Sequence, residues 1–241
     1  MTRRKLPFAY PFGLSVRLRL DSAMPPTMTA NALRGHLAEF GIVAARGLGK
    51  VSDLMSIVEH GDGRLPECAR SALMEIVGQL SNLDGRIHNL EAEISRRHRS
   101  DEMSQLLTSV PGIGTLTASA ITATVVDPSV FRSGREFAAW VGLVPRQYST
   151  GGKSSLGGIS KAGNQYLRRL LVIGATAVLR HIRRHPTPDH RWALQLLERK
   201  PPKLAAVALA NKMARVIWAM LSHGEQFRPG YGTKVTVAGS A

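Results

Sequence analysis

Apolar residues recur at the three- and four-residue spacing of an α-helix along most of this chain. Between residues 28 and 40, two leucines and a phenylalanine fall on one helical face, and Gly41 is placed to end that helix. Shorter helices are predicted at 50–60 and, after Pro66, from Glu67 onward. Further helices are predicted at 133–143, 164–184, 189–199 and 203–222. The pattern therefore predicts a mainly α-helical fold.

The longest apolar stripe lies between residues 73 and 94. Its members are separated by 4, 3, 3, 4, 3 and 4 residues, which is close to the seven-residue repeat of a coiled coil. They are Leu73, Val77, Leu80, Leu83, Ile87, Leu90 and Ile94. Such a stripe packs either on a neighbouring helix of the same chain or on a second copy. The sequence thus predicts a long, coiled-coil-like linker helix, and a homo-oligomer formed through it is one of the two interpretations.

The segment LLTSVPGIGTLTASAITATV, residues 106–125, has the pattern of a helix–hairpin–helix. It predicts a helix that ends at Val110, a tight turn, and a second helix that begins at Thr115. Gly112 and Gly114 permit the turn, and the free N–H groups at the start of the second helix could bind a phosphate. Because the same turn also serves for simple packing, contact with DNA is one of two roles open to it.

The least ordinary chemistry lies in PRQYSTGGKSSLGGISKAGNQYLRR, residues 145–169. No apolar period runs from Tyr148 to Asn164, which predicts a loop without regular secondary structure. Glycines let a backbone approach an anion, Lys153 and Lys161 add positive charge, and hydroxyl groups supply donors or nucleophiles. This combination indicates contact with phosphate or nucleic acid. Catalysis and a solvated glycine-rich loop are the alternatives.

The formal charge of the chain is +15 at pH 7, and its pI is near 11.0. Between Arg132 and Arg215 there are 16 Lys or Arg residues against three Asp or Glu, so one part of the chain carries most of the imbalance. A concentrated basic block indicates a polyanionic partner, because neutralising phosphates releases condensed counterions. Nucleic acid is the partner predicted here, and Arg168 and Arg169 are expected to contact its phosphates. An anionic membrane and ribosomal RNA are the competing partners.

Composition argues against several classes of site. Cys68 is the only cysteine, which leaves no intrachain disulfide and no zinc site built from thiolates, and fits a reducing cytoplasm. The histidines within 181–190 lack a paired carboxylate at ligand spacing, so no metal site is expected there. The apolar stretch 204–210 is followed at once by polar and charged residues, so we expect no membrane span. We therefore predict a cytoplasmic location.

Three motifs of this chain occur in the same order in a known family. They are VPGIGTLTASAI, FRSGREFAAWVGLVPRQYSTGGKSSLGGISKAGNQYLRRLL and KLAAVALANKMARVIWAML. Together they resemble the C-terminal region of bacterial insertion-sequence transposases of the IS110/IS1111 type, which form the IS116/IS110/IS902 family. NALRGHLAEFGI, residues 31–42, is similar to the segment that precedes the helical linker of these proteins. The likeness covers residues 28–228 and is most specific through 106–171.

The resemblance implies DNA recombination, meaning strand breakage and rejoining. Members of the family have an N-terminal RuvC-like domain with four metal-binding acidic residues, a coiled-coil linker, and a C-terminal domain whose glycine-rich loop carries a serine nucleophile. On this chain the nucleophile position matches Ser149, with Thr150 as the adjacent alternative and Ser154 as a weaker candidate. Three cations could neutralise the charge that builds up on the phosphate: Arg146, Lys153 and Lys161. One branch of the family is guided by a structured RNA, which is therefore a further implied partner.

The chain departs from the family pattern at its N-terminal end. About 30 residues precede Asn31, and Asp21 is their only carboxylate, so the four-acid magnesium site cannot be built from them. We therefore expect a truncated transposase that binds DNA but is inactive alone. It would hold no cofactor itself and would need magnesium only together with the acidic domain, which leaves its status as an enzyme open. The alternative is a non-catalytic nucleic-acid-binding helix–hairpin–helix module.

The sequence thus predicts four regions along the chain. They are an unstructured or non-homologous lead-in at 1–27, a helical linker at 28–100, a C-terminal transposase domain at 101–228, and a disordered tail at 229–241. The candidate catalytic residues are Ser149 and Thr150, and no metal ligand is predicted. The candidate DNA-binding residues are Gly112, Gly114, Arg146, Gly151, Gly152, Lys153, Lys161, Asn164, Arg168 and Arg169.

Overall fold

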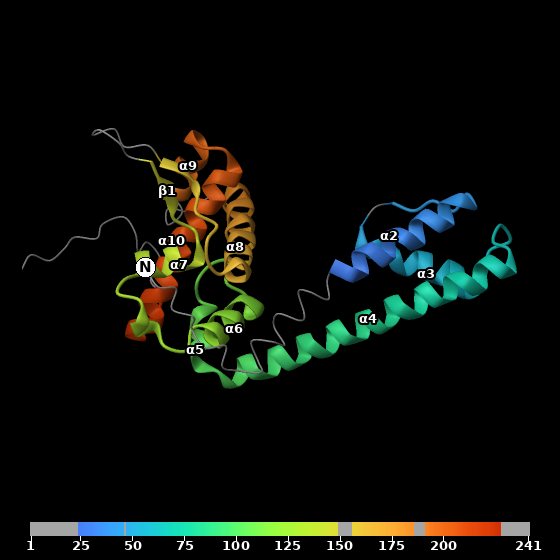
Figure 1. Ribbon diagram of the computed structural model, residues 1–241, viewed down its shortest axis with the longest axis horizontal. Coiled ribbons are helices and arrows are strands. Elements are labelled where there is room, and N and C mark those ends of the chain that lie inside the picture. The colour runs from blue at the N-terminus through green and yellow to red at the C-terminus, as the bar shows by residue number, and fades with distance from the viewer. Residues whose placement is uncertain (1–23, 46, 149–155, 186–190, 228–241) are drawn as a thin grey trace, which may run out of the picture. The chain divides into compact units, whose positions relative to one another are not determined.

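The computed structural model describes residues 24–45, 47–148, 156–185 and 191–227 (Figure 1). These residues are mainly helical, with one two-stranded sheet, which confirms the predicted mainly α-helical fold. They form two compact units that divide between Ile94 and Ser95. The N-terminal unit comprises the described residues up to 94, and the C-terminal unit comprises those from 95 to 227.

The N-terminal unit has one hydrophobic core to which three helices contribute. They are α2 (Met24–Glu39), α3 (Val51–His60), which follows the short 3-10 helix η1 (Leu48–Lys50), and the first part of α4 (Glu67–Ser100). Residues spaced by three or four fall on one face of each helix and are buried there, among them Leu33, Leu37, Leu54, Val58, Leu73 and Val77. Gly41 follows the end of α2 as predicted, in the left-handed conformation with φ of 72°.

Helix α4 is the long helix that the apolar stripe predicts, and it extends over 34 residues. The first part of its stripe is buried in the N-terminal core, at Leu73, Val77 and Leu80. Three members of the second part are only partly buried: Leu83, Ile87 and Leu90. The stripe of α4 is therefore covered unevenly along its length.

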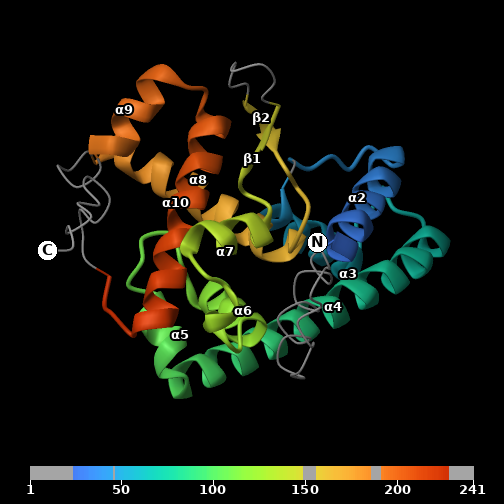
Figure 2. The ribbon, with the colours of Figure 1, turned by 60° about the vertical axis from the view of Figure 1, so that its left-hand side comes forward.

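The C-terminal unit is built around α8 (Gln165–Arg184) and α10 (Pro202–His223), which lie side by side (Figures 1 and 2). Helix α7 (Gly134–Val141) packs on α10, α6 (Thr115–Thr124) packs on α8, and α9 (Arg191–Arg199) contacts both central helices. Helix α5 (Glu102–Leu107), the 3-10 helix η2 (Pro128–Val130) and strands β1 (Pro145–Gln147) and β2 (Leu156–Ile159) complete the unit.

Small side chains let α10 approach its neighbours closely. Its buried face includes four alanines, at positions 205, 206, 210 and 214. At the start of α7, a Cβ added to Gly134 would lie 3.0 Å from the carbonyl oxygen of Arg215. Among the described helices, α10 is the one long and apolar enough to cross a membrane by length and composition alone. Core helices pass the same test, and α10 has the contacts of a core helix, with α7, α8 and α9.

The turn between α5 and α6 is pressed against the middle of α8. Gly112 has a φ of 87°, and a Cβ added there would lie 2.7 Å from Val178 Cγ2 and 2.8 Å from the carbonyl oxygen of Gly174. A Cβ on Gly174 would in turn overlap the carbonyl oxygen of Gly112. Both positions therefore require glycine for the turn and α8 to come this close.

Two local predictions are wrong. The first helix of the 106–125 segment ends at Leu107 instead of Val110, because residues 108–110 wind more tightly and each N–H donates to the carbonyl three residues earlier. The segment 148–164 is not irregular throughout, since β2 pairs antiparallel with β1 and places Ile159 opposite Pro145. The sequence predicts a loop here because this segment lacks alternating apolar residues. Strand pairing is made by backbone groups, so it can form without that alternation.

We predict that Gly174→Ala destabilises the C-terminal unit by about 1–3 kcal/mol, the usual cost of overpacking. The three tryptophans all belong to this unit, so urea unfolding followed by tryptophan fluorescence should report the lower free energy of unfolding. Gly85→Ala in α4 is the control, because nothing lies within 4 Å of a Cβ at that site. It should leave the fluorescence transition where it is in the wild-type chain. An equally unchanged transition in Gly174→Ala would contradict the close contact.

Candidate nucleic-acid interface

The start of α6 presents backbone N–H groups at the surface. Its N-cap is Gly114, which is exposed and extended (φ −92°, ψ 175°), and no side chain caps the helix. The N–H groups of the first turn therefore have no side-chain acceptor, and the helix dipole favours an anion there. Gly112 differs, because it is partly buried and packs against Gly174 and Val178. Of the two predicted glycines, Gly114 lies at the accessible surface and Gly112 positions the turn.

A polar network that the sequence pattern does not predict joins α5 to α6. Asp101, the N-cap of α5, accepts the N–H of Ser104 at 3.0 Å and the hydroxyl of Thr122 at 2.8 Å. The Ser104 hydroxyl is buried and lies 2.7 Å from His98 Nδ1 and 3.4 Å from Ser119 Oγ. Since buried polar groups must keep partners, the network fixes α6 relative to α5. An aspartate before a helix is a recognisable cap, but its bond across to α6 leaves no sequence signal.

We use the name glycine-rich segment for residues 145–159, and strands β1 and β2 form its base. The two candidate nucleophiles, Ser149 and Thr150, lie outside the described residues, and so do three candidate DNA-binding residues, Gly151, Gly152 and Lys153. What the structure describes is the stretch of chain on either side of them, residues up to 148 and from 156 onward.

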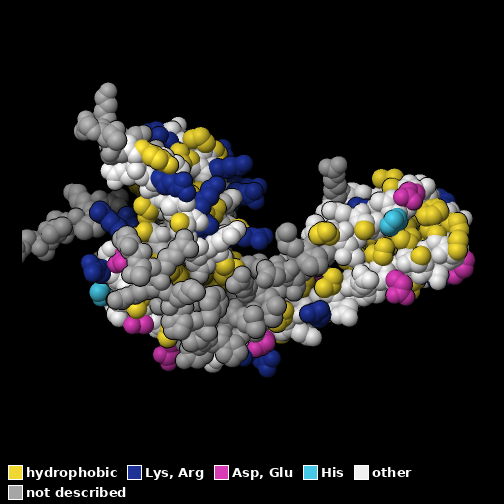
Figure 3. All heavy atoms as spheres, in the orientation of Figure 1, with side chains coloured by type: hydrophobic (Ala, Val, Ile, Leu, Met, Phe, Trp, Pro, Cys, Tyr) yellow, Lys and Arg dark blue, Asp and Glu magenta, His cyan; other side chains and the backbone are white. Residues whose placement is uncertain are grey.

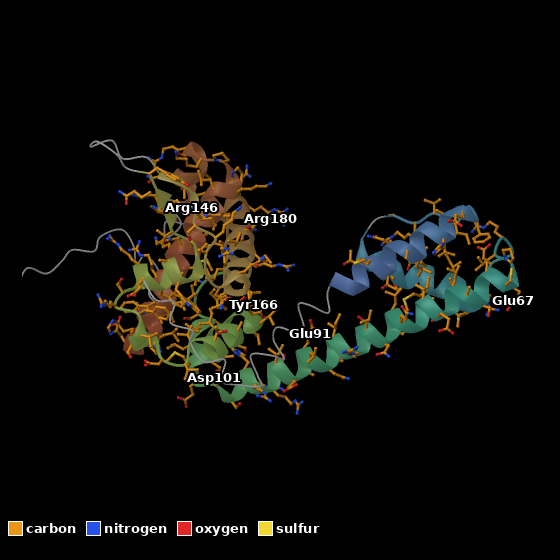
Figure 4. The ribbon with its side chains drawn as sticks, in the orientation of Figure 1. Glu67, Glu91, Asp101, Arg146, Tyr166 and Arg180 are labelled. Carbon is orange, nitrogen blue, oxygen red and sulfur yellow. The ribbon has the colours of Figure 1, made fainter. Side chains whose placement is uncertain are left out.

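At this base, two hydrogen bonds and a ring contact join the chain of β1 to the chain of β2. The N–H of Ser160 donates to the carbonyl of Val144 at 2.9 Å, and Arg146 Nη2 donates to the carbonyl of Ser160 at 3.2 Å. The ring of Tyr148 lies over Gly157, where an added Cβ would be 2.7 Å from Cε2. Arg146 is labelled in Figure 4. Its side chain is exposed, so its charge is accessible on the strand that precedes residues 149–155 in the sequence.

The far end of the glycine-rich segment is held by the C-terminus of α7. The N–H of Asn164 donates to the carbonyl of Trp140 at 3.1 Å, and the N–H of Lys161 donates to the carbonyl of Gly142 at 3.3 Å. Gly163 has a φ of 131°, and a Cβ there would overlap the carbonyl oxygen of Trp140. The glycine pattern alone predicts a backbone that approaches an anion, whereas in the structure Gly163 allows close packing on α7.

Two of the predicted DNA-binding residues make bonds within the chain. Asn164 is the N-cap of α8, and its Oδ1 accepts the N–H of Leu167 at 3.0 Å. Arg168 is partly buried, and its Nη1 donates to the carbonyl of Val141 at 2.8 Å beside Gly142. Arg168 therefore satisfies a carbonyl at the C-terminus of α7, where helical carbonyls lack partners within the helix.

Arg169 and Lys161 lie at the surface. Arg169 follows Arg168 on α8 but is exposed, and it forms no ion pair with the residues that the structure describes. Lys161 is exposed and has a positive φ of 54°. Arg146, Lys161 and Arg169 are therefore the exposed cations among the candidate DNA-binding residues that the structure describes.

Positive charge extends over the rest of the C-terminal unit. In Figure 3, Lys and Arg side chains gather over the part of this unit that contains α8 and α9. Lys212 lies 4.6 Å from the centroid of the Trp192 ring, and burial together with the neighbouring Arg215 lowers its pKa. The unit thus holds many like charges close together, which favours an anionic partner.

The described part of the chain has no cluster of three or more metal-ligating side chains. In residues 24–45, 47–148, 156–185 and 191–227, no three side chains of His, Cys, Asp or Glu are grouped as metal ligands. His181 and His185 are neighbours, with ring centroids 5.1 Å apart, but they are two ligands at most. These residues do not fit the magnesium site that the family resemblance implies.

The sequence of this region matches a family of transposases. A sequence model described as "Transposase IS116/IS110/IS902 family" matches residues 104–191. The "Probable family 20 transposase" of Pseudomonas aeruginosa is 44% identical over 217 residues, which are 89% of this chain and 64% of that protein. The transposase for insertion sequence element IS1111A of Coxiella burnetii is 38% identical over 219 residues, 90% of this chain and 59% of that protein.

A third relative extends the comparison. The transposase for insertion sequence element IS1328 of Yersinia enterocolitica is 38% identical over 197 residues, which are 82% of this chain and 58% of that protein. This chain belongs to the IS116/IS110/IS902 family of insertion-sequence transposases. It spans less than two thirds of the length of each of these relatives.

Substitutions of the two adjacent arginines of α8, Arg168 and Arg169, should differ in their effect on stability. We predict that Arg168→Ala lowers the free energy of unfolding of the C-terminal unit by about 1–2 kcal/mol, because the carbonyl of Val141 loses a charged donor. Arg169→Ala should change it by less than about 0.5 kcal/mol, as is usual for an exposed side chain. Urea unfolding followed by tryptophan fluorescence measures both. Equal effects of the two substitutions would show that the bond from Arg168 does not stabilise the unit.

Proposed function

We propose that this chain takes part in DNA strand breakage and rejoining as the portion of an insertion-sequence transposase that holds DNA and carries the nucleophile, Ser149. The observation that carries this proposal is the anchored base of the segment 149–155. One side of that base is β1, which pairs with β2, and the far side is bonded to the end of α7. The match to the transposase family covers the same residues. A reactive segment needs such a fixed base, because a nucleophile must be held in line with the phosphorus atom.

The proposed step transfers a phosphodiester to serine. The Oγ of Ser149 attacks the phosphorus, an ester bond forms between serine and phosphate, and the bond from phosphorus to one sugar oxygen breaks. That oxygen takes up a proton, and the serine proton passes to a base. Negative charge grows on the phosphate oxygens during the attack, and Arg146, Lys153 and Lys161 would stabilise it. Rejoining is the reverse attack by a strand hydroxyl, which releases the serine.

The proposed DNA contacts are to the phosphate backbone. They comprise the start of α6 at Gly114, with Gly112 shaping the turn before it, and the glycine-rich segment with Gly151, Gly152 and Lys153. At the start of α8 the contact is Arg169, which Asn164 and Arg168 position through their bonds within the chain. Backbone N–H groups and cations recognise phosphate without reading the bases, so these contacts position the strand and do not specify its sequence. A structured guide RNA is a second proposed partner, and it would supply the sequence information that phosphate contacts lack.

We also propose that this chain does not cleave DNA by itself. The relatives it matches are longer, and the family resemblance implies that an acidic domain contributes to the reaction. In the described residues no group of acidic side chains could take that role. Cleavage therefore requires the remaining part of a family member, supplied on the same chain or on another.

The nucleophile can be identified with a covalent adduct. This chain is joined to the part of the Pseudomonas aeruginosa relative that it does not match, and the fusion is incubated with duplex DNA and magnesium. We expect a protein–DNA adduct that resists denaturing electrophoresis, that Ser149→Ala abolishes it, and that Thr150→Ala retains it. Affinity for DNA should be the same in both variants, because neither hydroxyl is needed for phosphate binding.

Three other results of the adduct experiment would change the proposal. An adduct lost in Thr150→Ala and retained in Ser149→Ala would move the nucleophile by one residue. DNA binding by the fusion without any adduct would favour the non-catalytic nucleic-acid-binding module. An adduct formed by this chain without the added part would contradict the proposal that it is inactive alone.

A homo-oligomer through α4 is proposed as well. It is supported by the partly buried positions Leu83, Ile87 and Leu90, which continue the seven-residue repeat beyond the N-terminal core. A second copy of the same helix would bury them as knobs between its own side chains.

We predict that the wild-type chain is a dimer and that Ile87→Asp makes it monomeric, because a carboxylate cannot be buried in an apolar seam without a partner. Sedimentation velocity measures the change in mass. His88→Asp is the matched control, since His88 is exposed on another face of the same helical turn. A monomeric wild type, or an Ile87→Asp variant that stays dimeric, would rule out this seam.

A further inference from the structure

One face of α8 is exposed along its whole length. Its exposed positions recur every three or four residues and form what we call the α8 face: Arg169, Ile173, Ala177, Arg180 and Arg184. The opposite face is buried in the C-terminal unit, through residues that include Leu167, Leu171, Ala175, Leu179 and Ile182. The exposure is therefore a property of one side of the helix, and fraying of an end does not account for it.

The α8 face carries positive charge without negative charge. Helix α8 contains no Asp or Glu, and its arginines 169, 180 and 184 form no ion pair with any residue in the described ranges. In Figure 3, Lys and Arg side chains line this edge of the C-terminal unit, and in Figure 4 Arg180 extends from α8 away from the body of the unit. The surface is complementary in charge to a polyanion.

The centre of the α8 face is apolar. Ile173 is 54% exposed, and Ala177 is exposed beside it, so two apolar positions separate Arg169 from Arg180. At ~1.5 Å per residue, these two arginines lie about 17 Å apart along the helix axis. The major groove of B-form DNA is about 12 Å wide and admits an α-helix. Arginines this far apart can reach phosphates on both sides of the groove while the apolar centre faces the base edges.

We propose that the α8 face binds double-stranded DNA in the major groove. Arg169 contacts the phosphates of one strand, Arg180 and Arg184 contact those of the other, and Ile173 packs against thymine methyl groups. The inference rests on the proposed function and deepens it, because it names the form of the nucleic acid and a surface on α8 that binds it. Duplex RNA is a poorer fit, since side chains do not enter its deep, narrow major groove. Single strands are also a poorer fit, since they stack on aromatic rings and the α8 face has none.

Salt dependence of binding tests the arginine contacts. The full chain is titrated, at salt concentrations from about 50 to 200 mM, against a fluorescent mixed-sequence DNA duplex of about 30 base pairs. The slope of the logarithm of the association constant against the logarithm of the salt concentration should become shallower by about 2 in Arg180→Gln/Arg184→Gln. In Arg169→Gln it should become shallower by about 1. Arg96→Gln/Arg99→Gln is the matched control, because it removes the same charge from exposed positions of α4. This control should keep the wild-type slope.

Replacing thymine with uracil tests the contact of Ile173. A duplex rich in A·T pairs is compared with the same duplex made with uracil, which lacks only the methyl group. The wild-type chain should bind the uracil duplex several-fold more weakly, and Ile173→Ala should bind the two duplexes equally. The salt slope should be unchanged in Ile173→Ala, because no phosphate contact is lost.

The results separate this inference from the proposed function. If Arg180→Gln/Arg184→Gln changes the slope no more than the α4 control, or if an RNA duplex of the same sequence binds as tightly as the DNA duplex, the α8 face is not the duplex-binding surface. The proposed function would survive that result, because it depends on the adduct of Ser149. If the wild-type chain binds DNA duplex, DNA single strand and RNA duplex equally poorly at low salt, the proposed function itself fails.

Discussion

The arrangement of the candidate site depends on hydrogen bonds to the backbone carbonyls at the C-terminus of α7. Its last carbonyls have no partners within the helix, and three successive ones accept bonds from the residues that follow the glycine-rich segment. The carbonyl of Trp140 binds the N–H of Asn164, that of Val141 binds the guanidinium of Arg168, and that of Gly142 binds the N–H of Lys161. The described chain that precedes residues 149–155 and the described chain that follows them are therefore both attached to one helix terminus, and they pair with each other as β1 and β2. The end of a helix thus fixes the base of the segment that carries Ser149.

Sequence patterns predicted those features that a short stretch of residues determines. The start of a helix at about residue 164, Gly41 after α2 and the start of α6 at Thr115 each depend on neighbours within a few residues, and the structure has all three. Contacts between distant segments left no such signal. The partner of Gly112 is Gly174, 62 positions further on, and strand β2 contains two glycines whose own preference is against a strand.

The glycines and arginines of the site show why composition alone misassigned some roles. The glycine-rich pattern predicts a backbone that approaches an anion. In the structure, Gly157 leaves room for the ring of Tyr148, and Gly163 leaves room for the carbonyl of Trp140. Arg168 and Arg169 are identical in sequence terms, yet one helical step turns the first toward α7 and the second toward solvent. The phase of the helix, set by its buried leucines, decides which arginine is free to bind a ligand.

The excess of positive charge makes ligand binding and stability of the C-terminal unit interdependent. Like charges held close together in the folded state raise its free energy. Lys212 is one local example: burial is the main cause of its lowered pKa, and the positive charge of the neighbouring Arg215 lowers the pKa further. A polyanion that binds the folded unit removes part of the repulsion and stabilises the fold by mass action. The arginines that do not stabilise the unit through contacts of their own, such as Arg169, are then those with the most to contribute to DNA binding. Arg168 is different, because its bond to α7 already stabilises the fold without a ligand. Loss of Arg168 would therefore reduce affinity through the fold as well as through charge, whereas loss of Arg169 would act through charge alone.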